Sequence, residues 1–218
     1  MKALSVLNEA GSPLRILCVG AHCDDIEIGC GGTLLHLMQT REVDISWVVF
    51  SSGGSRRQEA EASAREFLDG ATSSRVIVKE HRDGFLPYSG AAVKEDFEEL
   101  KGMVDPQLVF THTRSDLHQD HRLLCELTWN SFRNHTILEY EIPKYDGDLG
   151  APSLFVPLSE KISRRKVELL LKHYGSQAGK AWFTEDVFLA LARLRGMECN
   201  AAEGLAEAFY SRKAVLEF

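Results

Sequence analysis

The feature that most constrains the fold is a regular alternation of short, β-branched apolar runs with longer amphipathic segments. The strand-like runs lie at residues 15–21, 44–52, 75–80 and 107–113. Apolar side chains recur at helical spacing over residues 28–40, 56–70, 93–104 and 121–132. This alternation is typical of βαβ units with right-handed crossovers. We therefore expect an α/β fold with a Rossmann-like open, mostly parallel sheet and helices on both faces.

The pattern changes beyond residue 137, where a stretch containing Gly and Pro precedes two further helical segments, 161–174 and 186–196. The chain shows neither an internal repeat nor a low-complexity linker. A length of 218 residues suits one compact unit. We expect one domain over residues 1–218, with the C-terminal part packed on the sheet or closing over its crevice.

Composition excludes several classes of protein. The chain is 44% hydrophobic and 26% charged with a net charge of -7, which fits a soluble globular protein and disfavours nucleic-acid binding. Its five cysteines contain no C-x-x-C pair, so we expect reduced thiols and a cytoplasmic location. No run of about 20 apolar residues is present, so no membrane span is expected.

Two polar segments follow two of the expected strands. His22-Cys-Asp-Asp25 comes directly after residues 15–21, and Asp116-Leu-His-Gln-Asp-His121 comes after residues 107–113. In open α/β sheets, ligands bind in the crevice beyond the carboxyl ends of the strands. The two segments are therefore expected to meet although about a hundred residues separate them.

Their residue types predict a catalytic metal site. A catalytic zinc ion takes three protein ligands and keeps one position open. His22 and Asp25 share one tight turn, and His121 can supply the third ligand. Asp24 is then placed to accept a proton from water as a general base.

The second segment offers another group for the same chemistry. His118 lies three residues before His121 and can face a developing oxyanion as an imidazolium. Asp120 is expected to orient His118 and hold its charge. Together these groups predict hydrolysis of an amide or ester.

Each residue also has a simpler interpretation. His22 can be an ordinary turn histidine, and Asp24 and Asp25 can cap the following helix. Gly29-Cys-Gly-Gly32 can be a packing turn or a phosphate loop without the full G-x-G-x-x-G spacing. Two acid and histidine clusters at two strand ends are harder to explain by capping, which favours the metal site.

With these residues the chain resembles the LmbE-like (PIG-L) family of zinc-dependent de-N-acetylases. The carrying motifs are Ala21-His-Cys-Asp-Asp-Ile-Glu27 with the following glycines, Asp116 to His121, Arg56-Arg-Gln-Glu59, the segment from Lys166 to Gln177, and Leu205-Ala-Glu-Ala-Phe209. The resemblance implies removal of acetyl from a small-molecule acetamido sugar.

The resemblance also implies a role for each matching residue. His22, Asp25 and His121 would bind Zn²⁺, with Fe²⁺ or another divalent ion as an alternative, since such a ligand set is not selective. Asp24 would be the general base. His118, supported by Asp120, would act as acid or oxyanion stabiliser. Arg56 would hold substrate oxygens; it can equally be a surface arginine, with Arg57 as a competitor.

The sequence departs from the family pattern at several points. Cys23 replaces a proline, and its thiol can ligate metal or simply fill space. Glu27 lies one residue later than in the strictest motif, so we expect only a helix-start charge. The short loop before Arg56 predicts a more open crevice and hence a larger substrate than a monosaccharide.

Other functions remain open at this point. A nucleotide-sugar binding module would use the glycines to cradle phosphates, and a metal-dependent amidase or esterase would act on a non-sugar substrate. Whether the chains form a homo-oligomer is not readable from the sequence. We assign no role to four aromatic residues of the C-terminal part: Tyr140, Tyr145, Trp182 and Phe183.

Overall fold

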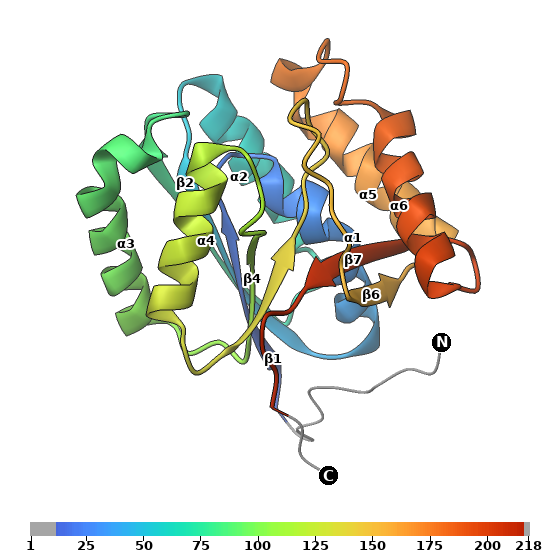
Figure 1. Cartoon of the computed structure of the whole chain (residues 1–218), viewed down its shortest axis with the longest axis horizontal. Coiled ribbons are helices and arrows are strands. Elements are labelled where there is room, and N and C mark those ends of the chain that lie inside the picture. The colour runs from blue at the N-terminus through green and yellow to red at the C-terminus, as the bar shows by residue number, and fades with distance from the viewer. Residues whose placement is uncertain (1–11, 216–218) are drawn as a thin grey trace.

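The architecture is one seven-stranded sheet covered by helices on both faces, seen in a computed structural model that describes residues 12–215 (Figure 1). The strands are β1 (Leu14–Gly20), β2 (Val43–Ser51), β3 (Ser73–His81), β4 (Leu108–His112), β5 (Thr136–Tyr140), β6 (Leu154–Pro157) and β7 (Ala206–Tyr210). The helices are α1 (Asp25–Thr40), α2 (Ser55–Phe67), α3 (Gly90–Met103), α4 (Gln119–Ser131), α5 (Glu160–His173) and α6 (Glu185–Cys199), with short 3₁₀ turns η1 (Leu86–Ser89) and η2 (Gly175–Gln177).

The strand order is β3-β2-β1-β4-β5-β7-β6. The first five strands of this order pair in parallel, whereas β7 pairs antiparallel with both β5 and β6. The expected mostly parallel α/β sheet is thereby confirmed. The sequence pattern predicts no strand over residues 154–157 or 206–210, which form the antiparallel extension, β6 and β7.

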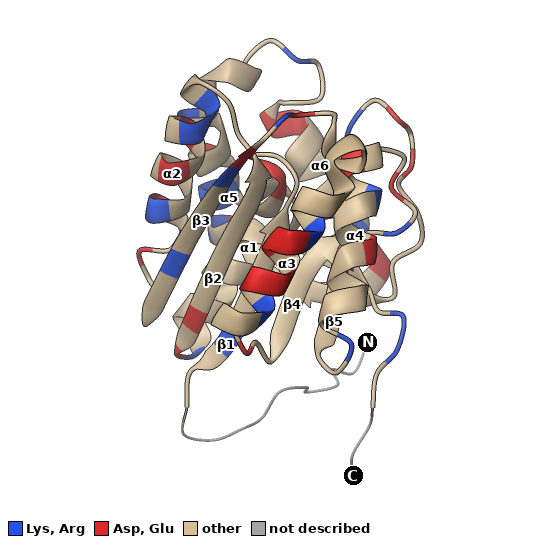
Figure 2. Ribbon diagram, turned by 90° about the vertical axis from the view of Figure 1, so that its left-hand side faces the viewer, with Lys and Arg blue, Asp and Glu red and all other residues tan. Residues whose placement is uncertain are grey.

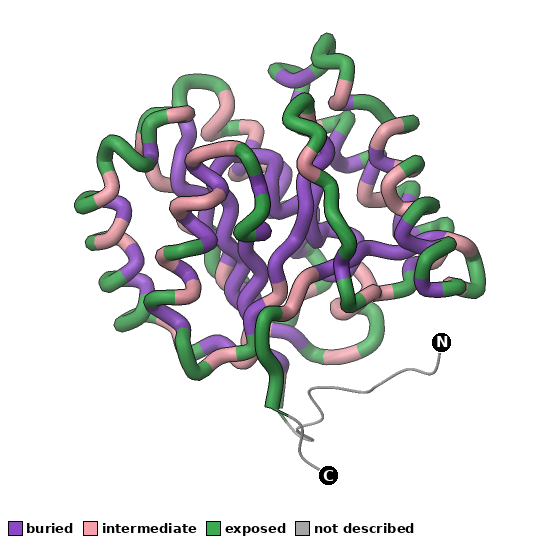
Figure 3. The backbone as a smooth tube through the Cα atoms, viewed as in Figure 1, coloured by how far each residue is buried: buried purple, intermediate pink, exposed green. Residues whose placement is uncertain are grey.

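Alternating side chains of the strands fill two cores. Along β1, Ile16 and Cys18 pack with α1, α2 and α5 on one face, whereas Leu17 and Val19 pack with α3 and α4 on the other. Figure 3 shows the central strands buried throughout and the outer turns of the helices exposed. Burial on both faces explains why these strands are continuous apolar runs.

The glycines after the first motif lie inside α1 rather than in a loop. A Cβ atom on Gly29 would come within 2.2 Å of the Tyr140 ring, and one on Gly31 within 2.8 Å of Phe67. These glycines therefore allow close packing of α1 on its neighbours, which is the packing alternative and not a phosphate cradle.

Acidic and basic residues are interspersed along α2 and α3 (Figure 2). Within residues 12–215, no helix is long and apolar enough to cross a membrane.

Candidate active site

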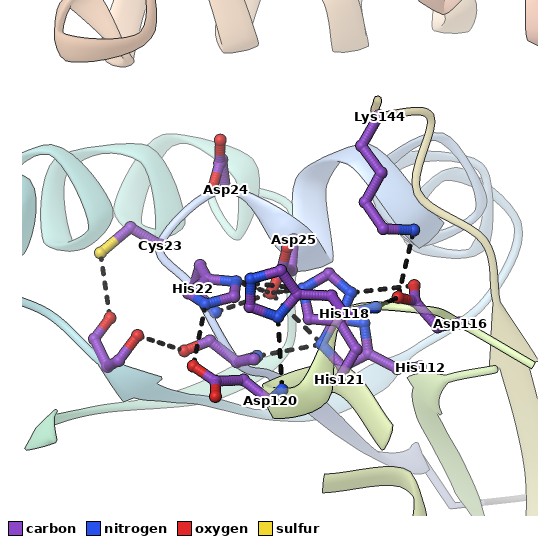
Figure 4. Close-up of polar contacts among 12 residues, drawn as sticks. His22, Cys23, Asp24, Asp25, His112, Asp116, His118, Asp120, His121 and Lys144 are labelled. Atoms are coloured by element: carbon purple, nitrogen blue, oxygen red, sulfur yellow. Dashed lines mark hydrogen bonds and ion pairs between the residues drawn. The ribbon is translucent and has the colours of Figure 1, made fainter. Parts of the chain in front are cut away.

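The two polar motifs meet at the carboxyl ends of β1 and β4, which are neighbours in the sheet. His22 to Asp25 connect β1 to α1, and Asp116 to His118 connect β4 to α4. Figure 4 shows His22, His118 and His121 gathered around Asp25. The topology thus brings together the residues that the sequence placed at two strand ends.

Three of these residues form a compact set of possible metal ligands. His22 Nδ1 lies 3.0 Å from His121 Nε2 and 3.3 Å from Asp25 Oδ2, and the last two atoms are 3.5 Å apart. Ligands at about 2.0–2.2 Å from a tetrahedral zinc ion stand roughly 3.3–3.6 Å from one another. The three side chains are 8% exposed or less. Their donor atoms therefore fit one divalent ion.

Both histidines of this set are held from behind by a carboxylate. His22 Nε2 lies 3.3 Å from Asp120 Oδ2, and His121 Nδ1 lies 2.9 Å from Asp116 Oδ2. A carboxylate on the outer ring nitrogen is characteristic of histidines that bind metal, because it fixes the tautomer and the ring orientation. A proton on each outer nitrogen would leave the inner nitrogens as acceptors, as metal binding requires.

Asp116 is itself firmly held. Its Oδ1 accepts a hydrogen bond from the His118 amide at 2.8 Å and lies 3.1 Å from Lys144 Nζ. Burial alone would raise the pKa of Asp116, but the hydrogen bond from His121 and the nearby positive charges bring the pKa well below its usual value. Asp116 therefore stays ionised behind His121.

Asp24 has the features expected of a base. Asp24 is only 3% exposed, and its Oδ2 atom has no hydrogen-bond partner among residues 12–215. Burial, followed by the charge of Asp25, raises the pKa of Asp24, while Arg56 opposes the shift. In Figure 4 its carboxylate stands apart from the imidazole cluster. It makes no side-chain cap on α1, so the capping alternative does not describe it.

His118 caps α4 through one ring nitrogen, because Nδ1 accepts a hydrogen bond from the Asp120 amide at 3.3 Å. The proton of the neutral ring is then on Nε2. Burial, followed by the charge of His22, lowers the pKa of His118. The lowered pKa favours a neutral ring that donates through Nε2–H over the expected imidazolium.

The Asp120 carboxylate does not orient His118 as expected. It accepts hydrogen bonds from the amides of Gly84 at 2.8 Å and Leu86 at 3.1 Å, and it faces His22. Asp120 therefore ties the segment after β3 to His22.

Arg56 lies at the site and Arg57 does not. The Arg56 guanidinium is 3.3 Å from Asp24 Oδ1 and 2.8 Å from Asp83 Oδ2. Arg57 pairs instead with Glu61 and Glu80 on the surface. Of the two candidates, Arg56 has the position expected of a residue that contacts substrate.

Two residues of the site were missed from the sequence. Asp83 Oδ1 lies 3.2 Å from His22 Nε2, and the hydrogen bond to His22 lowers the pKa of Asp83 to about 2. His112 is fully buried, with Nε2 3.2 Å from Asp25 Oδ2 and its ring stacked on His121 at 3.9 Å. Asp83 follows β3 and His112 ends β4. Their position at the carboxyl end of an expected strand was the sequence signal that could have identified them.

Two departures from the family motif have structural explanations. Glu27 lies in the first turn of α1 as expected, but it is fully buried and accepts a hydrogen bond from Ser63 Oγ at 2.6 Å, and burial raises its pKa to about 8. Cys23 is buried with Sγ 3.5 Å from the Ser51 carbonyl oxygen, and it points away from the imidazole cluster in Figure 4. Cys23 therefore fills space and is not a ligand in this arrangement.

A crevice of about 260 Å³ opens over the cluster. Besides the motif residues it is lined by Arg56, Asp83, Lys144, Tyr145, Gln177 and Trp182. Of the four aromatic residues left without a role, Tyr145 and Trp182 thus line the crevice, whereas Tyr140 and Phe183 are buried in the core.

Comparisons with known proteins agree with this geometry. Residues 17–132, more than half of the chain, match the PIG-L family model, described as GlcNAc-PI de-N-acetylase. The chain is 28% identical over 178 residues to the uncharacterized deacetylase YaiS of Escherichia coli (strain K12), covering 78% of this chain and 95% of the relative.

Solved structures share the fold at low identity. N,N'-diacetylchitobiose deacetylase from Pyrococcus horikoshii superposes with a TM-score of 0.70 at 22% identity, covering 90% of this chain and 83% of the other. The 4-carboxy-2-hydroxymuconate hydratase GalB from Pseudomonas putida KT2440 gives 0.69 at 16% identity, covering 94% and 98%. The fold therefore serves more than one chemistry. The match over residues 17–132, which contains both polar motifs, shows that the chain belongs to the PIG-L family of deacetylases.

Proposed function

We propose that this protein is a metal-dependent hydrolase that removes the acetyl group from an N-acetylated amino sugar and releases acetate. One observation carries the proposal: His22, Asp25 and His121 present three donor atoms within 3.5 Å of one another, in a crevice that is also lined by Asp24, whose buried Oδ2 has no hydrogen-bond partner among residues 12–215. Zn²⁺ is the proposed ion, with Fe²⁺ as the alternative. A divalent ion at these ligands would supply a Lewis acid and lower the pKa of water.

The protein's own groups would then divide the remaining work. Asp24, whose raised pKa makes it a stronger base, would take the proton from the attacking water and pass it to the sugar nitrogen as the C–N bond breaks, so that the free amine and acetate leave. His118 Nε2–H would donate a hydrogen bond to the oxygen that gains charge on the acetyl carbon. Asp116 and Asp120 would keep the two histidine ligands oriented, and Arg56 would hold Asp24 and contact the substrate.

A sugar substrate is supported by the crevice and by the relatives. The crevice combines aromatic faces, Tyr145 and Trp182, with several polar groups, as sites for hydroxylated ligands do. The family description and the Pyrococcus horikoshii structure both name N-acetylated sugars. All five cysteines are free thiols, which supports the proposed cytoplasmic location.

The proposal is tested by measuring acetate release, with and without added Zn²⁺ or Fe²⁺, from a panel of N-acetylated sugars, sugar–lipid head groups and nucleotide sugars. The same panel includes simple acetyl esters and non-sugar acetamides. Metal-dependent release from the sugars supports the proposal. Release confined to the non-sugar compounds would assign a general amidase or esterase, and no release with a full complement of metal would refute deacetylation.

A further inference from the structure

The turn Ser176-Gln177 is a sequence motif that the proposed chemistry does not use. Both residues belong to the short turn η2 (Gly175–Gln177), which follows α5. Gln177 lines the crevice and is only 3% exposed. A polar side chain so deeply buried at a binding crevice requires an account of its hydrogen bonds.

The second unused residue, Glu59, fixes this turn. Its carboxylate accepts a hydrogen bond from the Ser176 amide at 2.9 Å and another from Ser176 Oγ at 2.5 Å. Glu59 lies on α2, one turn after Arg56. The Arg-x-x-Glu motif therefore contacts two separate segments, with Arg56 at Asp24 and Glu59 at Ser176.

These bonds decide how the Gln177 amide is oriented. Ser176 Oγ has one proton and gives it to Glu59, so this oxygen can only accept from other groups. Gln177 Nε2 lies 3.0 Å from Ser176 Oγ and donates to it. The carbonyl end, Oε1, is left buried without a hydrogen-bond partner within residues 12–215.

A buried acceptor without a partner destabilises a protein by about 1–3 kcal/mol. At a crevice, a bound ligand that offers a donor can complete such a group. We propose that Gln177 Oε1 accepts a hydrogen bond from a ring hydroxyl of the bound sugar, which makes Gln177 a specificity-determining residue positioned by Glu59 and Ser176. This inference rests on the proposed function and names one contact of its substrate.

A hydroxyl is the group that this position fits. A neutral amide carbonyl recognises a donor and offers nothing to an acyl oxygen or to an anion. The acetamide carbonyl would lie beside His118 and the ligand set. The non-reacting part of the sugar would then face Gln177, in contact with Trp182.

The test is Gln177→Met, which keeps the volume and removes the acceptor. We expect kcat/KM to fall about 10-fold, mainly through KM, because one neutral hydrogen bond is lost. The melting temperature should stay close to that of the parent, because removal of the unsatisfied acceptor offsets the loss of the Nε2 hydrogen bond to Ser176. Gln39→Met is the matched control: Gln39 is exposed near the other end of α1, and neither quantity should change.

Monodeoxy substrates separate recognition from a structural role. For one monodeoxy analogue, kcat/KM of the parent enzyme should be about 10-fold lower than for the full sugar. With Gln177→Met, the same analogue and the full sugar should give equal kcat/KM. Additive losses for every analogue, or a lower melting temperature with KM unchanged, would overturn the inference.

Binding of the same sugars, followed by ligand-observed NMR, is independent of turnover. If the parent releases no acetate, deacetylation is refuted as the function. The affinities of the parent and of Gln177→Met for the sugars still test whether Gln177 contacts the ligand. Weaker binding to Gln177→Met supports its role, and equal binding or no binding to either protein refutes it.

Discussion

Asp116→Asn tests whether the carboxylate behind His121 serves a metal ligand. Asp116 Oδ2 lies 2.9 Å from His121 Nδ1, and Oδ1 is held by the His118 amide. Asparagine can keep the bond from the His118 amide, but its NH₂ group then faces His121, whose ring loses its acceptor. Loss of such an outer partner typically lowers metal affinity about 10- to 100-fold, or roughly 1.4–2.7 kcal/mol.

The affinity is measured by competition for Zn²⁺ with a chromophoric chelator at fixed pH. Asp105→Asn is the control, because the Asp105 side chain is 85% exposed, and its affinity should equal that of the parent. Circular dichroism checks that the Asp116→Asn variant is folded. A folded Asp116→Asn protein that binds Zn²⁺ as tightly as the parent would refute the reasoning that His121 is a ligand oriented by Asp116.

Further predictions concern the base, the oxyanion donor, packing and pH. Asp24→Asn should keep its metal content, measured by elemental analysis, and lose about 100- to 10,000-fold in kcat; full activity would remove Asp24 as the base. His118→Ala should lose about 100- to 1000-fold in kcat. Gly29→Ala places a Cβ atom 2.2 Å from the Tyr140 ring, so the free energy of unfolding should fall by about 1–3 kcal/mol in urea titrations. Burial raises the pKa of Glu27 to about 8 in the folded protein, above its ordinary value of 4.5. The folded state then binds more protons than the unfolded state, so the free energy of unfolding of the metal-free protein should decrease as the pH rises from 4.5 to about 8. Glu27→Gln should flatten that slope, and an unchanged slope would contradict the assignment.

The parallel part of the sheet was predictable because its strands are buried on both faces and therefore read as continuous apolar runs. The antiparallel extension was not predictable from the sequence. Its strand β6 has only four residues, Leu154–Pro157, and is half exposed, so it forms no continuous apolar run. Boundaries of helices also shifted: α1 begins at Asp25 and not at Ile28. That the chain forms one domain over residues 1–218, and that it forms an oligomer or not, stay predictions.

The site was predictable where a motif supplied several groups at one strand end. His22, Asp25 and His121 could be found because parallel strands bring their carboxyl ends to one edge of the sheet. Asp83 was missed because it is a lone acid in an irregular segment, and the partner of Asp120 was misassigned because sequence proximity favoured His118. Orientation of side chains depends on contacts between distant segments, such as Gly84 with Asp120, which no local pattern encodes.

The central claim is that one divalent ion is held by His22, Asp25 and His121. It is tested most directly by an anomalous-scattering map from crystals of the protein grown with Zn²⁺. We predict one peak about 2.0–2.2 Å from His22 Nδ1, Asp25 Oδ2 and His121 Nε2. A fully occupied peak elsewhere, with these three atoms left without metal, would contradict the account.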